Sequence, residues 1–250
     1  MMKVRLLPTV KILALSLFAV AVLTLCQTTT RADEVFIQGY TNGCFGAACV
    51  PPNSGGLAVY QTATIFGLQY NNSNFDGTTA SGFLGFGGNA VPGGLNDDNF
   101  GSFSLAGSLA NYNGQSFTLR VTFVDPQGVN GSNTALFTAT LVGTVTSTSN
   151  GGVFIDFNNT PLHFTFNDTS CGATTVAGQQ TTCGTGSFFL TINDLAINPG
   201  QTASLTGQIT EASQTAVPEP ATLLLLGTGL SSAAAIARKK RLRQQQQNRA

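Results

Sequence analysis

Oxygen-bearing side chains in two short segments of this sequence could bind a metal ion. Residues 72–77 (NSNFDG) place such side chains at alternate positions before a glycine, a spacing typical of the start of a calcium-binding loop. Asp97 and Asp98 could join them, but the acid that closes such a loop is absent, because Phe83 occupies its position. A solvated turn explains the same residues. The sequence therefore leaves calcium binding open, and we expect no metal or cofactor.

Few groups in the chain suit catalysis. His163 is the single histidine, and its apolar neighbours predict that it faces outward from a strand. Asp156 and Asp168 could be the paired acids of a glycoside hydrolase, but nothing in the sequence brings them together. The sequence has no G-x-S-x-G nucleophile motif and no glycine-rich phosphate loop between a strand and a helix. We therefore expect that the protein is not an enzyme.

Four cysteines lie beyond the N-terminal segment, at Cys44, Cys49, Cys171 and Cys183. An even number in an exported chain predicts two disulfides. We favour the pairs Cys44–Cys49 and Cys171–Cys183, because each pair brackets a glycine-rich segment. A zinc site that includes His163 is the alternative, although neither pair has the C-x-x-C spacing.

Residues 1–32 have the three parts of a secretory signal peptide. Basic residues come first, and residues 12–25 form an apolar core that is too short to favour a membrane-spanning helix. Cleavage after Ala32 would leave Asp33 as the new N-terminus. Lipidation of Cys26 is the alternative, but Leu25 is larger than the residue that normally precedes a lipidated cysteine.

The C-terminal residues 217–250 also consist of three successive segments. Pro218, Glu219 and Pro220 come first, and the prolines favour extended backbone. Residues 221–237 carry no charge and as a helix would span about 25 Å, enough to cross a thin bilayer. The tail 238–250 opens with a basic cluster that predicts a cytoplasmic end: Arg238, Lys239, Lys240, Arg241 and Arg243.

This succession of a Pro-Glu-Pro triad, an apolar helix and a basic tail resembles the PEP-CTERM sorting signal of Gram-negative bacteria. The resemblance covers residues 217–243. It implies that the membrane protease exosortase recognises the signal and removes the tail. It also implies an inner-membrane precursor, a mature form at the cell surface or outside the cell, and a link to exopolysaccharide or biofilm.

The body between the two ends is acidic. Residues 33–217 contain ten carboxylates and one basic residue, Arg120, which gives a net charge of 1 − 10 = −9. Such a body repels the phosphates of nucleic acids, so we expect no nucleic-acid partner.

Period-two alternation and frequent Gly/Asn turns predict an all-β body, an antiparallel β-sandwich or jelly roll. The clearest strand is 116–124, with Phe117, Leu119, Val121 and Phe123 on one face. Residues 135–145 repeat the pattern, and further strands are predicted at 35–40, 56–70, 101–109, 153–157, 162–166, 187–193 and 203–210. We assign residues 33–210 to this domain and 211–216 to a linker.

The leading hypothesis is a non-catalytic exported protein of the cell surface or extracellular matrix. A carbohydrate-binding module that acts on exopolysaccharide is the main alternative. It would need exposed aromatic rings, and the chain has no Trp and 4 Tyr. An extracellular hydrolase is the third hypothesis.

Overall fold

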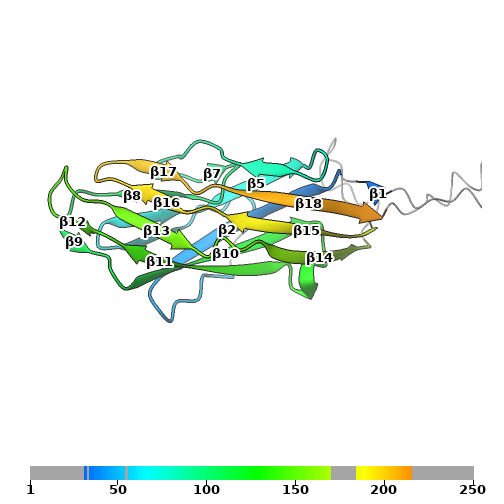
Figure 1. Cartoon of the computed structure of the whole chain (residues 1–250), viewed down its shortest axis with the longest axis horizontal. Helices are drawn as coiled ribbons and strands as arrows, with labels where there is room; N and C mark the ends of the chain where they lie inside the picture. Colours follow the sequence, from blue (N-terminus) through cyan, green and yellow to red (C-terminus); the bar gives the residue numbers. More distant parts are fainter. Residues whose placement is uncertain (1–30, 33, 54–55, 170–183, 216–250) are drawn as a thin grey trace, which may run out of the picture. The chain divides into compact units, whose positions relative to one another are not determined.

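The computed structural model describes residues 31–32, 34–53, 56–169 and 184–215 (Figure 1). The chain divides into two units, Met1–Ala216 and Val217–Ala250, and every described residue belongs to the first. Within these ranges no helix is long and apolar enough to span a membrane. The membrane helix predicted at 221–237 and the basic tail lie outside the described residues.

The largest sheet has seven strands, and its first six are antiparallel neighbours (Figure 1). The seventh, β7, runs parallel to β5. In spatial order the strands are β16 (Leu195–Ile197), β13 (Val153–Phe157), β11 (Thr134–Val142), β10 (Gln115–Asp125), β2 (Phe36–Phe45), β5 (Ser73–Thr78) and β7 (Asn96–Asp97).

Three smaller sheets complete the body, and all of their pairings are antiparallel. One contains β1 (Arg31–Ala32), β18 (Gly207–Thr215), β15 (Gly184–Ile192) and β14 (Leu162–Asp168), with β6 (Leu84–Phe86) beside β18. Another contains β17 (Thr202–Ser204), β8 (Ser102–Leu105), β4 (Leu68–Asn71) and β3 (Thr62–Ile65). The third pairs β12 (Thr144–Val145) with β9 (Ala110–Asn111). A short 3-10 turn lies at Val129–Gly131. The all-β prediction is confirmed.

Aromatic side chains join the sheets into one core. Phe123 of β10 lies 5.6 Å from the ring of Phe164 and 5.3 Å from that of Phe188, both in the β14–β15 sheet. Phe117, near the other end of β10, packs on Phe103 and Tyr70 of the β8–β4 sheet. The seven-stranded sheet thus forms one layer, and these two sheets pack on different parts of its inner face.

The predicted alternation of β10 is confirmed. Phe117, Leu119, Val121 and Phe123 are all buried, as expected from the period. In β11 the pattern holds to Leu141, but the strand ends at Val142, before the predicted end at 145. Gly143 causes the break, because it has φ 132°, which an L side chain rarely adopts.

Three sequence expectations were wrong. Residues 72–77 form no turn, because 73–78 form β5, in which 74–78 pair with β2. Leu162, the first residue of β14, is 38% exposed although its parity with Phe164 and Phe166 predicts burial. The predicted linker begins too early, because 211–215 belong to β18, which extends the body toward the sorting signal.

Candidate functional site

The structure brings together the carboxylates of Asp76, Asp97 and Asp98. One oxygen from each lies within 4.8 Å of the others, and all three side chains are exposed. Asp76 faces outward on β5 because Phe75 beside it faces the core. Asp97 lies on β7, which pairs in parallel with β5, and its register partner is Asn74.

Two buried asparagines flank the segment that contains Asp97 and Asp98, in which Asp97 ends β7. The side-chain nitrogen of Asn96 donates to the backbone oxygen of Asn72 at 3.0 Å, and its side-chain oxygen accepts from the Val91 backbone at 2.7 Å. Asn96 and Asn99 are both buried and flank the acids in sequence. The Gly88 backbone N–H donates to the Asp98 carbonyl at 2.7 Å. These hydrogen bonds therefore fix the backbone that carries Asp97 and Asp98.

The charges in the cluster oppose one another. Partial burial, and then the neighbouring carboxylates of Asp98 and Asp97, raise the pKa of Asp76. Partial burial and Asp98 likewise raise the pKa of Asp97, while a hydrogen bond to the Asp98 backbone opposes the change. A proton or a hard cation would relieve this repulsion. With one oxygen from each carboxylate, the cluster supplies three of the six to eight oxygens that Ca²⁺ takes, so on this count it makes a partial site.

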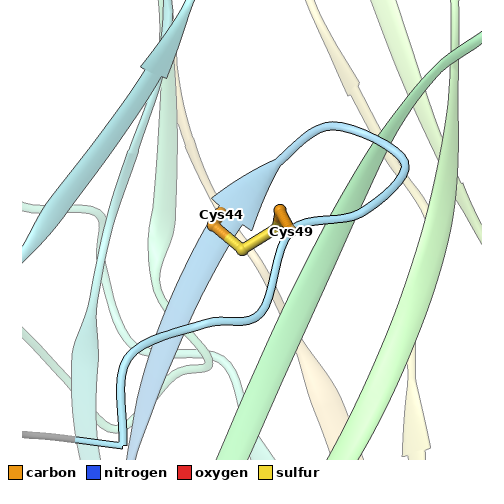
Figure 2. The surroundings of a disulfide bond; sticks show 2 residues. All are labelled: Cys44 and Cys49. Atoms are coloured by element: carbon orange, nitrogen blue, oxygen red, sulfur yellow. A yellow bond between two sulfur atoms is a disulfide. The ribbon is translucent and has the colours of Figure 1, made fainter.

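One predicted disulfide is present in the described part of the chain. Cys44, at the end of β2, is bonded to Cys49 on the following loop, with their Cα atoms 6.0 Å apart (Figure 2). The predicted Cys171–Cys183 pair lies outside the described residues. After Cys49 the chain crosses the outer face of the seven-stranded sheet. There the Pro52 carbonyl accepts from the Asn42 side chain at 3.3 Å, and Asn53 accepts from Arg120 at 2.7 Å.

His163, Asp168 and Asp194 contact other parts of the body. His163 faces outward as predicted and packs against Phe189, with the ring centroids 4.8 Å apart. Asp168 is buried at the end of β14 and accepts a hydrogen bond from the Gln127 backbone at 2.8 Å. Asp156 is exposed on β13, in a different sheet from Asp168. Asp194, which the sequence analysis did not single out, accepts from the Phe157 backbone at 2.8 Å and from Asn159 at 2.9 Å.

A shallow hollow of about 220 Å³ opens beside β11. Its lining combines apolar side chains with hydroxyl and amide groups: Leu136, Phe137, Thr138, Asn158, Thr160 and Leu162. The hollow is not predictable from the sequence, because its residues come from β11, from the connection between β13 and β14 and from the first residue of β14, and β11 and β14 belong to different sheets.

These features define an all-β protein with a disulfide-bonded, acidic body. Residues 216–241 match the PEP-CTERM protein-sorting motif, which marks the chain as an exosortase substrate. The resemblance expected from the sequence is thus shown, and the motif implies an exported protein that is sorted to the cell surface. The matched stretch includes Pro218, Glu219 and Pro220, together with Arg238–Arg241 of the basic cluster. No curated protein and no solved structure matches the chain.

Proposed function

We propose that this chain is a non-catalytic protein of the cell surface or extracellular matrix, linked to exopolysaccharide or biofilm and built as an antiparallel β-sandwich. The sorting motif at 216–241 is the observation that supports the proposal, because it marks the chain for delivery to the cell surface. The motif itself identifies no activity there. In this proposal residues 1–32 are a signal peptide, and the helix 221–237 anchors the precursor in the inner membrane until exosortase acts.

The described side chains support a non-catalytic role. Asp168 and Asp194, which a hydrolase could use, accept backbone hydrogen bonds that fix the connections between strands. His163 packs on a neighbouring ring. The rings of Tyr70 and Tyr112 are buried, and their hydroxyls donate hydrogen bonds to the backbone. Tyr70 donates to the Phe100 carbonyl at 2.9 Å and Tyr112 to the Phe66 carbonyl at 2.7 Å.

The position at which β18 ends supports the proposal that the folded body stays intact when the sorting signal is removed. β18 runs to Thr215, where it pairs with Thr185 of β15, and the matched motif begins at the next residue. Removal of the motif would therefore leave every described strand intact. If the signal peptide is cleaved after Ala32, the two residues of β1 are lost, and β18 still keeps β15 as a neighbour.

Mass spectrometry of the extracellular protein tests this proposal. We expect an N-terminus near Asp33 and loss of the residues that follow the Pro-Glu-Pro triad. The double variant Pro218→Ala, Glu219→Ala should stay in the inner membrane, while the control Pro92→Ala, in an exposed loop, should be processed normally. An extracellular form that still carries residues 238–250 would refute the sorting route.

A further inference from the structure

The outer face of β11 and β13 carries a strip of exposed side chains, which we call the β11 strip. It contains Leu136, Thr138, Thr140 and Val142 of β11 with Phe154 and Asp156 of β13. Three of its large apolar side chains are well exposed: Leu136 at 54%, Val142 at 46% and Phe154 at 41%. The neighbouring strands β2 and β10 differ, because the chain after Cys49 hydrogen-bonds to their outward-facing Asn42 and Arg120.

Strand register arranges the strip in rows. Val142 pairs with Phe154 and Thr140 with Asp156, so each row has side chains from both strands. The pairing ends at Ala139 and Phe157. Beyond this point the connection to β14 brings Asn158, Thr160 and Leu162 beside Leu136 and Thr138, where they form the 220 Å³ hollow. From Val142 to Leu136 the strip is about 20 Å long at the usual rise of a strand.

The groups around the hollow are held in place but keep free polar atoms. Asp194 fixes the connection through the Phe157 backbone and Asn159. The Asn158 side-chain oxygen accepts from the Thr160 backbone at 3.1 Å, which closes a tight turn. Within the described residues, the side-chain nitrogen of Asn158 and the hydroxyls of Thr138 and Thr160 have no protein partner. A ligand could therefore bind these groups without breaking an internal bond.

From this arrangement we propose that the β11 strip and its hollow bind a neutral polysaccharide. Apolar side chains lie at the two ends of the strip, with hydroxyl groups and Asp156 between them and an amide group in the hollow. A sugar ring likewise has apolar and polar surfaces, its C–H faces and its hydroxyl edges. The hollow has room for about seven water molecules, so it suits one ring-sized polar group and not a large ligand.

Charge favours a neutral polymer over an acidic one. The body has a net charge of 1 − 10 = −9, which repels polyanions, and the strip itself contains one acid, Asp156, and no base. The inference rests on the proposed surface role, since it names the partner that the delivered body would meet. It can fail alone, because the mass-spectrometric test of processing does not depend on any glycan.

Affinity electrophoresis of the full-length chain tests the inference. The chain is kept in a detergent without sugar groups and run through gels that contain dextran, galactomannan, a soluble β-glucan or, for comparison, the acidic polymer alginate. We expect retardation by at least one neutral polymer. Phe154→Ala and Leu136→Ala should each weaken that binding about tenfold, as truncation of a contributing apolar side chain does.

Matched controls separate the strip from general surface effects. Phe83→Ala and Leu109→Ala truncate the same residue types at exposed positions outside the strip, 50% and 75% exposed, and should change binding less than about twofold. Circular dichroism of each variant checks that it folds. The proposal is overturned if no neutral polymer retards the chain, if alginate binds more tightly, or if the controls weaken binding as much as the strip variants. It is also overturned if the strip variants only disrupt self-association in sedimentation, because the strip would then be a contact between copies of the chain.

Discussion

Phe123 is the side chain whose truncation best tests the layered core. It is 2% exposed on β10 and contacts three rings: Phe75 of its own sheet, and Phe164 and Phe188 of the facing sheet. The distances between ring centroids are 6.1, 5.6 and 5.3 Å, so the ring fills the space between the two layers. Phe123→Ala would remove the contact that joins both layers at this point.

The expected cost follows from the buried area. A buried aromatic side chain removes about 150–250 Å² from water, which at about 25 cal/mol per Å² corresponds to about 4–6 kcal/mol as an upper estimate. Measured Phe→Ala changes in cores cost about 3–5 kcal/mol, since the cavity partly collapses. We therefore expect Phe123→Ala to lower the free energy of unfolding by about 3–5 kcal/mol. Thr122, the next residue, is on the opposite face, and Thr122→Ala should cost less than about 1 kcal/mol.

Urea unfolding of residues 33–216, followed by circular dichroism, measures both changes. The variant should unfold at a lower urea concentration with an unchanged slope, which would indicate lost stability in the same fold. The reasoning is refuted if the two substitutions cost equal amounts, or if the spectrum is helical. In either case the period-two assignment of 116–124 to a buried strand would be wrong.

Three further predictions follow from local contacts, each with a readout in thermal or urea unfolding. Gly39→Ala should cost at least about 1–3 kcal/mol, because the added Cβ would meet the Thr122 carbonyl and the Phe75 ring, whereas Gly87→Ala, with nothing within 4 Å, should be nearly neutral. Replacing Cys44 and Cys49 together by Ser should cost about 2 kcal/mol for the short loop they close, and reducing agent should lower the stability of the parent protein by more than that of the variant. Asp97→Asn should stabilise the protein at pH 7 by about 0.2–1 kcal/mol, less at high salt, because a raised folded-state pKa means that stability falls as the pH rises above the ordinary value of 3.8. The gain should vanish below that pH, it should persist with a chelator present, and Asp156→Asn should lack it.

The strands that could be predicted are those that bury one face in the core and turn the other face outward. From Ser116 to Phe123 in β10 each inward residue is apolar and each outward residue polar or charged, so the period defines this part of the strand and its buried face. The local disulfide was also predictable, since Cys44 and Cys49 can meet across a single turn whatever the topology. The sorting motif is linear, so its recognition needs no fold at all.

The strand pattern failed where the backbone changes its register. In β18 the buried residues are Gly207, Ile209 and then Ala212, so the period-two pattern breaks after Ile209. Glu211 has φ 53°, and the pairing with β15 skips a residue between Ser187 and Phe189. Such a bulge adds one residue to one strand and inverts the alternation that follows. The period-two pattern in the sequence therefore ends at 210, although the strand continues to Thr215.

The candidate sites depend on long-range pairing, which no local pattern encodes. Asp97 meets Asp76 because β7 pairs in parallel with β5, and the sequence could name the acids but not the pairing. The β11 strip has the same origin. The alternation at 135–145 predicts which residues of β11 face outward. Their exposure to solvent depends on which strands the chain after Cys49 covers. That segment hydrogen-bonds to Asn42 and Arg120 on β2 and β10, while Leu136 and Phe154 on the adjoining strands remain exposed.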